Sequence, residues 1–242
     1  MNRPRVSVLI PARNAAPFVT EQIHCVLGQD FRDLELVACD NGSADSTWDA
    51  LCAFKSHPKV RLLRDREGLP VGAVRNRLLR EARGEYVMPC DADDWLLQGS
   101  VSALAAVLDR KPAVGYCYGS YLMLETGARG RYVRPPWIRG RAHRPDIDLM
   151  EFTANHAGSL MRRDLVLAVG AYDEDTPLDS VSLTLKLSEI TRLKHVSDRL
   201  TYVYRRRARG GQRPDWAQAF LKLARRAMAR RVDAARKAGP PA

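Results

Sequence analysis

Three carboxylates stand within four residues in the segment Asp91-Ala92-Asp93-Asp94. Their mutual repulsion is costly without a counter-charge, so a bound cation would explain the cluster. Mg²⁺ and Mn²⁺ suit such a site, because they bind through oxygen ligands, usually one or two carboxylates together with substrate phosphates. A solvated acidic loop, or aspartates that cap a following helix, would explain the same residues. The cluster alone leaves these explanations open.

Three short apolar runs in the first half of the chain each end in polar residues. The runs and the residues that follow them are Val6–Ile10 with Pro11–Asn14, Leu34–Cys39 with Asp40, and Tyr86–Cys90 with Asp91. In an open parallel sheet, ligands bind outside the carboxyl ends of the strands. If the three runs are strands of one such sheet, the polar residues meet at one edge. This convergence favours a metal-binding crevice over a solvated loop.

The elements that would position these residues alternate regularly through the first 110 residues. Val60–Leu63 is a further strand-like run, and the intervening stretches have apolar residues at helical spacing. The predicted helices are 16–27, 45–54 with Ser43 as N-cap, 71–82 ended by Gly84, and 100–109. This order predicts an α/β protein with a Rossmann-like, mostly parallel central sheet and helices on both faces.

The second half of the chain has a less regular pattern. Residues 113–124 and 200–206 have the character of strands, with a turn at Thr126-Gly127 and Arg131–Val133 as a pairing partner for the first of them. Helical spacing occurs at 146–152, at 180–190 and in a long terminal segment, 216–237, whose arginines lie mostly opposite its apolar face.

Composition limits the class of protein. The 242 residues are 45% hydrophobic and 28% charged, as in one globular domain with a full core. The apolar runs are too short to cross a bilayer, and the N-terminus lacks the apolar segment of a signal peptide. Five cysteines without C-x-x-C spacing fit buried thiols in a reducing compartment, so we expect a cytoplasmic protein.

The formal net charge of +11 is concentrated at one end of the chain. Residues 201–242 contain twelve Lys or Arg against two Asp, whereas the remainder is nearly neutral. A positive segment of this kind attracts anions, so residues 205–237 could contact an anionic membrane surface, at the inner face, or an acidic partner. A solvated helix face would have the same composition. The near-neutral body and the absence of a nucleic-acid-binding motif predict no specific nucleic-acid partner.

Three segments together resemble glycosyltransferase family 2, whose members have the GT-A fold. They are VSVLIPARN, LELVACDNGSADST and GAVRNRLLREARGEYVMPCDADD, within residues 5–110, and the likeness continues more loosely through GSLMRRDLVLAVGAYDED to Tyr204. The resemblance implies a nucleotide-sugar-binding half at 1–110, an acceptor-binding and catalytic half at 111–204, and a basic C-terminal helix at 205–242. It implies an inverting transfer of a hexosyl or N-acetylhexosaminyl group from a nucleotide-diphosphate sugar, most often a UDP-sugar.

The resemblance also assigns roles on the donor side. Pro11, Ala12, Arg13 and Asn14 would line the base and ribose, and Asp40 would bind the nucleoside from the turn that it forms with Asn41 and Gly42. Arg75 would lie near the donor phosphates or brace the acidic loop. Asp91, Ala92 and Asp93 form the D-x-D element, in which Asp93 is the expected ligand of Mn²⁺ or Mg²⁺. Asp91 would bind ribose, the metal or a metal-bound water.

The resemblance places the catalytic base after the segment Gly170-Ala171-Tyr172-Asp173-Glu174. Asp179 stands where the family carries the Asp of a Glu-Asp pair, and it is our candidate for the base that deprotonates the acceptor. Its alternative role is N-cap of the helix at 180–190. Three residues depart from the family pattern: Asn41 replaces a frequent Asp, Leu178 replaces the usual Glu, and Arg207 stands where some members have a histidine.

The acceptor side is less defined. His156, Trp95 and Trp137 are candidates for contact with the acceptor or the sugar, and each is equally explained as a packing residue. The acceptor would be a cell-surface glycan, a lipid-linked precursor or a small natural-product scaffold, free or bound to a carrier. Two other classes compete: a protein that binds nucleic acid or an anionic surface through the basic segment, and a nucleotidyltransferase. The segment Pro11–Asn14 lacks the Gly-rich phosphate loop that a nucleotidyltransferase needs.

Overall fold

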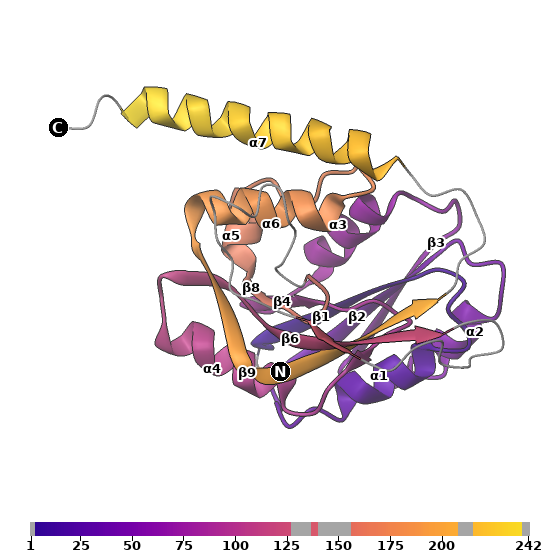
Figure 1. Ribbon diagram of the computed structural model, residues 1–242. Helices are drawn as coiled ribbons and strands as arrows, with labels where there is room; N and C mark the ends of the chain where they lie inside the picture. The colour runs from indigo at the N-terminus through magenta and orange to yellow at the C-terminus, as the bar shows by residue number, and fades with distance from the viewer. Residues whose placement is uncertain (1–2, 127–136, 140–155, 208–214, 239–242) are drawn as a thin grey trace.

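The computed structural model describes residues 3–126, 137–139, 156–207 and 215–238. Within these residues the strands form one nine-stranded sheet in the order β3-β2-β1-β4-β8-β6-β9-β5, with β7 paired to β6 (Figure 1). The strands are β1 Val6–Ala12, β2 Leu34–Asn41, β3 Val60–Asp65, β4 Tyr86–Pro89, β5 Trp95–Leu96, β6 Val114–Thr126, β7 Trp137–Arg139, β8 Leu160–Arg162 and β9 Arg192–Arg207. The helices are α1 Val19–Leu27, α2 Thr47–Cys52, α3 Val71–Glu81, α4 Ser100–Arg110, α5 Arg163–Ala168, α6 Asp179–Ile190 and α7 Trp216–Ala238.

The first four strands are parallel, as the sequence predicts. β1 lies between β2 and β4, with Val6 opposite Leu34 on one side and Tyr86 on the other. The second half completes a mixed sheet, because β8 runs antiparallel to β4 and β6, whereas β9 runs parallel to β6. The α/β class with a mostly parallel sheet is therefore confirmed.

Helices cover both faces of this sheet, which explains why its strands are apolar on both sides. Val8 and Ile10 of β1 belong to a core that includes residues of α1, α2 and α4. Leu9, between them, belongs to a second core with residues of α3, α5 and α6. Figure 1 shows the two sets of helices on opposite faces, with α7 lying over α6.

Several predicted boundaries differ from the structure for local reasons. β1 continues through Pro11 to Ala12, because its pairing with β4 ends at Leu9 and a missing N–H is tolerated beyond that point. α3 ends at Glu81, and Gly84 instead allows close approach to the backbone of Ser7. Ser43 does not cap α2, which begins at Thr47.

The second half contains further differences. α5 was not predicted, and β9 begins eight residues before the predicted strand at 200–206. The predicted turn at Thr126-Gly127, its strand at 131–133 and the helix at 146–152 lie outside the described residues, wholly or in part. None of the described helices combines the length and the apolar character that a membrane span needs.

Candidate active site

The carboxyl ends of β1 and β2 form one rim of the site. Ala12 and Asp40 are paired residues in adjacent parallel strands, so the loops that follow leave the sheet side by side. Asn14, in the left-handed region with φ of 50°, joins the loops: its N–H donates to Ser43 Oγ at 3.0 Å, and its Oδ1 accepts from Ala44 N–H at 2.9 Å. Of the three loops expected to converge, the two that follow β1 and β2 are therefore in contact.

Asp40 is buried at this rim and keeps an unused hydrogen-bonding position. Its Oδ1 accepts the Ser43 N–H at 3.3 Å, and its Oδ2 lies 3.3 Å from Nε of Arg64. Oδ2 makes no hydrogen bond in the described structure although it is shielded from solvent. A buried carboxylate oxygen of this kind has a strong need for a donor, and the N–H of a nucleobase or a ribose hydroxyl would supply one.

Asn41 and Gly42, next to Asp40, contact the loop that precedes α3. The Asn41 amide donates to the Leu69 carbonyl at 2.9 Å and accepts the Leu69 N–H at 2.8 Å, so it fixes the loop before α3. Gly42 has φ of 66°, and a Cβ there would lie 2.8 Å from the Gly68 nitrogen. The guanidinium of Arg13 lies against Gly68, next to the same loop.

The acidic loop has one carboxylate in the protein interior and two that are partly exposed. Asp94 points inward, where its Oδ1 accepts the Arg205 N–H at 2.8 Å. Burial, with Asp91 and Asp93 nearby, raises the pKa of Asp94 well above its ordinary value, which favours the protonated form. Asp91 and Asp93 are partly exposed, so a ligand can reach them.

The donor set fits a hard divalent cation that shares its coordination with a substrate. No group of three or more His, Cys, Asp or Glu side chains in the described part of the chain forms a complete metal site. Two carboxylates with no further protein ligand are the usual arrangement for Mg²⁺ or Mn²⁺ held together with phosphate oxygens. Asp91 and Asp93 are the residues that would hold it.

Arg75 connects the acidic loop to the candidate base. Its Nη2 donates to Asp91 Oδ1 at 2.9 Å, and its Nη1 donates to Asp179 Oδ2 at 2.7 Å. Its side chain is only 9% exposed. Burial alone would lower the pKa of Arg75, but the carboxylates of Asp91 and Asp179 raise it above its ordinary value, so the guanidinium stays charged. The three side chains form one buried network.

Asp179 is the first residue of α6 and faces Arg75. Leu178, not Asp179, occupies the N-cap position. The Asp179 side chain is almost fully buried, and burial raises its pKa, although Arg75 opposes the shift. Gly72 makes this packing possible, because a Cβ on Gly72 would overlap the carbonyl oxygen of Asp173 and lie 3.3 Å from the Asp179 Cβ.

The three acceptor-side candidates have different surroundings. His156 lies next to the Arg75 network: its Nε2 is 3.1 Å from the hydroxyl of Tyr172, whose ring lies against the Arg75 guanidinium, while its Nδ1 is buried without a partner in the described structure. Burial, assisted by Arg75, lowers its pKa, so the ring is neutral. Trp95 donates from Nε1 to Glu21 Oε2 at 3.0 Å and packs against other side chains. Trp137 is in β7, and its side chain lies outside the described residues.

Two residues of β9 support the acidic loop and were not assigned this role from the sequence. The Tyr202 hydroxyl accepts the Asp91 N–H at 2.8 Å. The Arg205 guanidinium lies between the rings of Phe18 and Trp95, at 4.7 and 4.1 Å from their centroids, and its Nε donates to the Asp93 carbonyl. β9 is far from residues 91–95 in the sequence, and its pairing with β5 brings these side chains together.

We expect Arg205→Lys to lower the free energy of unfolding by about 1–3 kcal/mol. Lysine cannot keep both the stacking on Phe18 and Trp95 and the hydrogen bond from Nε to the Asp93 carbonyl. Urea unfolding measures this effect. Arg199→Lys is the matched control on the same strand, since Arg199 is largely exposed and its ion pair with Asp198 is marginal, at 3.9 Å. An Arg205→Lys protein as stable as the control would show that Arg205 does not hold the loop.

Comparison with known proteins identifies the family of the chain. The family model described as Glycosyl transferase family 2 matches residues 7–169, well over half of the chain. The chain belongs to this family. The match includes the rim of β1 and β2, Arg75 and the acidic loop, but it ends before Asp179.

Two solved structures have a similar fold. The chain is similar to S. aureus TarS 1–349 in complex with UDP-GlcNAc, with a TM-score of 0.69 and 20% identity over 93% of this chain and 66% of that one. It is also similar to the mannosyltransferase PcManGT from Pyrobaculum calidifontis in complex with GDP-Man and Mn²⁺, with a TM-score of 0.66 and 22% identity over 100% of this chain and 77% of that one. The GT-A type of fold is thus confirmed.

Among curated relatives, the family 2 chain is 28% identical over 135 residues to an Escherichia coli protein, the UDP-Glc:alpha-D-GlcNAc-diphosphoundecaprenol beta-1,3-glucosyltransferase WfgD. The match covers 55% of this chain and 52% of WfgD. The chain spans about half, or less, of the length of the curated relatives it matches.

Proposed function

We propose that the chain is an inverting glycosyltransferase that moves a hexosyl or N-acetylhexosaminyl group from a nucleotide-diphosphate sugar, a UDP-sugar, to an acceptor hydroxyl. The observation that carries the proposal is the bridge of Arg75 between Asp91 and Asp179. It joins carboxylates suited to a cation and a diphosphate with a buried carboxylate suited to proton transfer. The relatives bound to UDP-GlcNAc and to GDP-Man with Mn²⁺ support this assignment.

The donor would lie across the rim of β1 and β2. Asp40 would accept a hydrogen bond from the nucleoside through Oδ2, which makes no hydrogen bond within the described structure, and Pro11–Asn14 would line the base and ribose. Asp91 and Asp93 would hold a divalent cation. When bound, the cation supplies positive charge that stabilises the departing diphosphate. Arg75 keeps Asp91 in place for this task.

Asp179 would act as the general base. The acceptor oxygen forms a bond to the anomeric carbon on the face opposite the diphosphate, and the bond from that carbon to the diphosphate oxygen breaks. The acceptor proton passes to the Asp179 carboxylate, and the nucleoside diphosphate leaves. One displacement inverts the anomeric configuration. Arg75 holds one oxygen of Asp179, which fixes the orientation of the base.

The acceptor and the setting are proposed more broadly. The name of WfgD specifies a lipid-linked diphosphate as its acceptor. This supports a glycan or a lipid-linked precursor as the acceptor of this chain, with a natural-product scaffold as the alternative. His156 and Trp137 remain the candidates for contact with the acceptor. Trp95 is a weaker candidate, because Arg205 covers one face of its ring.

We expect the protein to act in the cytoplasm, with the basic segment 205–237 in contact with an anionic surface or partner.

We expect Mn²⁺ to strengthen UDP binding by about tenfold or more, a change of about 1.4 kcal/mol or more. Isothermal titration calorimetry with and without Mn²⁺ measures this. Asp93→Asn should remove the enhancement and keep the metal-free binding, since Asp40 is unchanged. Asp198→Asn is the control, because this side chain is 78% exposed. Enhancement that survives in Asp93→Asn would remove Asp93 from the metal site.

A further inference from the structure

The basic helix α7 has two opposite faces with different contacts. Toward the domain it buries Leu223 and Ala227. Three cations on this side pair with acidic residues of the domain: Lys222 and Arg226 with Asp175, at 3.0 and 2.7 Å, and Arg230 with Glu189, at 2.8 Å. These contacts account for the way in which α7 is held on α6 and on the loop before it.

The opposite face of α7 exposes an apolar stripe. Leu221, Met228 and Val232 are 54, 58 and 46% exposed, which is high for large aliphatic side chains. Their spacing of seven and four residues places them on one side of the helix, along a length of about 16 Å. A helix that packs on a domain through one side needs one apolar face. Leu223 and Ala227 provide that face, so packing on the described part of the domain does not account for the second stripe.

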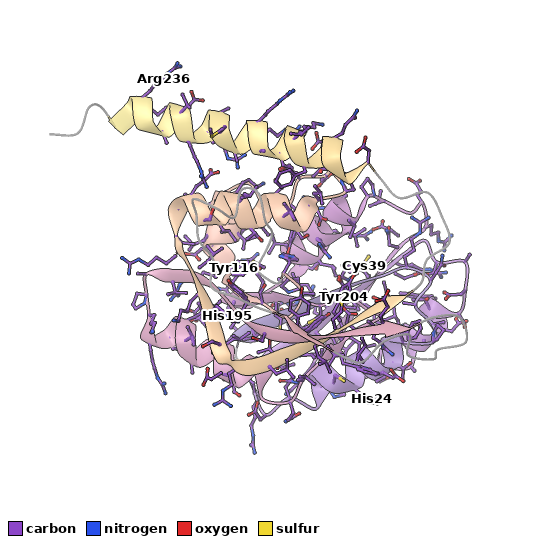
Figure 2. The ribbon with its side chains drawn as sticks, viewed as in Figure 1. His24, Cys39, Tyr116, His195, Tyr204 and Arg236 are labelled. Atoms are coloured by element: carbon purple, nitrogen blue, oxygen red, sulfur yellow. The ribbon has the colours of Figure 1, made fainter. Side chains whose placement is uncertain are left out.

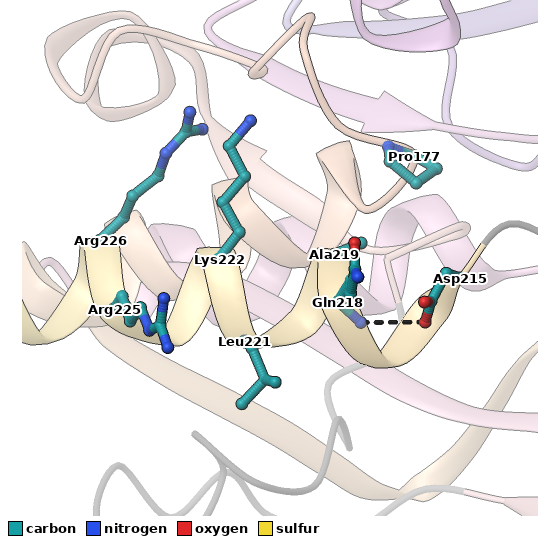
Figure 3. A pocket seen from close by; sticks show the side chains of 8 residues that line it. All are labelled: Pro177, Asp215, Gln218, Ala219, Leu221, Lys222, Arg225 and Arg226. Carbon is teal, nitrogen blue, oxygen red and sulfur yellow. Dashed lines mark hydrogen bonds between the residues drawn. The ribbon is translucent and has the colours of Figure 1, made fainter.

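Arginines flank this stripe. By helical spacing, Arg225 and Arg236 lie on one side of it and Arg231 on the other, and no described acidic side chain pairs with any of them. Figure 2 shows Arg236 extending away from the domain. Figure 3 shows Leu221 and Arg225 on one side of α7 and Lys222 and Arg226 on the other. The cations on the outward face are therefore available to an external anion.

We propose that this outward face of α7 docks on an anionic lipid bilayer, with Leu221, Met228 and Val232 inserted between lipids and the flanking arginines among the headgroups. A short apolar stripe beside cations on a helix is typical of interfacial helices. A second copy of the chain fits poorly, because two such helices repel each other. Three aliphatic side chains on a convex helix also fall short of the area that a stable protein interface needs.

Binding of the full chain to vesicles tests the proposal by co-sedimentation. Vesicles of phosphatidylcholine with 30% phosphatidylglycerol should bind the protein at 0.1 M salt, and phosphatidylcholine alone should not. Arg225→Gln/Arg231→Gln/Arg236→Gln should weaken binding by about a hundredfold. Leu221→Gln/Met228→Gln/Val232→Gln, which leaves the charge unchanged, should weaken it by about tenfold or more.

The matched control is Arg32→Gln/Arg80→Gln/Arg110→Gln, which removes three exposed charges from other elements. It should bind within a few-fold of the wild type, and circular dichroism should show equal helix content in all variants. Equal loss in the control would reduce the effect to net charge and overturn the proposal. So would the absence of binding to anionic vesicles, or binding to soluble polyglutamate in their place, which would assign the face to an acidic protein.

Discussion

Asp179→Asn is expected to lower kcat by about a thousandfold, because asparagine cannot accept the acceptor proton and general base catalysis contributes about 10²–10⁴-fold. The change is nearly isosteric, and the amide oxygen can still accept the hydrogen bond from Arg75. UDP binding should therefore stay within a few-fold of the wild type. Steady-state kinetics with a competent donor and acceptor, together with calorimetry for UDP, separates the two effects.

The control for this variant is Asp175→Asn in the loop just before α6, where the side chain is exposed and pairs with α7. It should keep kcat within a few-fold of the wild type. A wild-type turnover in Asp179→Asn would rule out Asp179 as the base. The pH profile gives a second check: burial raises the pKa of Asp179, so kcat should fall, as pH decreases, at a higher pH than for an ordinary aspartate. Asp179→Asn should lose that limb.

Arg75→Met should lower the free energy of unfolding at pH 7 by about 3–5 kcal/mol, because removing one partner of a buried ion pair leaves an uncompensated charge. Asp179 is the main source of the loss, since its carboxylate is almost fully buried. Urea unfolding measures the change. The loss should shrink at low pH, where protonation removes the charge from the stranded carboxylate.

A double-variant cycle assigns this loss to the network. Adding Asp179→Asn to Arg75→Met should recover about 1–3 kcal/mol relative to the sum of the single changes. Arg77→Met on the same helix is the control, because its ion pair with Asp65 is partly exposed and should contribute less than about 1 kcal/mol. If Arg75→Met costs no more than Arg77→Met, the buried bridge does not stabilise the fold.

The donor half of the site follows closely from the sequence. Its strands are short apolar runs that end in polar residues, and the parallel order of those strands brings the ends together, so the proximity of Asp40 to Pro11–Asn14 is predictable. The position of Asp179 came from the family resemblance. Its hydrogen bond to Arg75 joins residues 104 positions apart, and no local pattern encodes such a contact.

The parts that the sequence does not predict depend on long-range pairing. Asp94 belongs to the acidic cluster by sequence, but its side chain is buried, where it accepts a hydrogen bond from the Arg205 N–H of β9. Asp91 and Asp93 are then the two carboxylates that could bind a cation. Arg205 is one of many arginines in a basic segment, and its stacking on Trp95 arises only because β5 pairs with β9. Composition predicts that α7 is positively charged. Which of its cations form ion pairs depends on the positions of Asp175 and Glu189 in the domain on which α7 packs.

The most direct test of a shared crevice for donor, cation and base is a crystal structure of the protein with UDP and Mn²⁺, with the manganese located by its anomalous scattering. We expect one anomalous peak at Asp91 and Asp93, on the diphosphate of a UDP whose nucleoside contacts Asp40, with Asp179 across the same crevice. UDP bound elsewhere, or manganese away from both aspartates, would contradict the account.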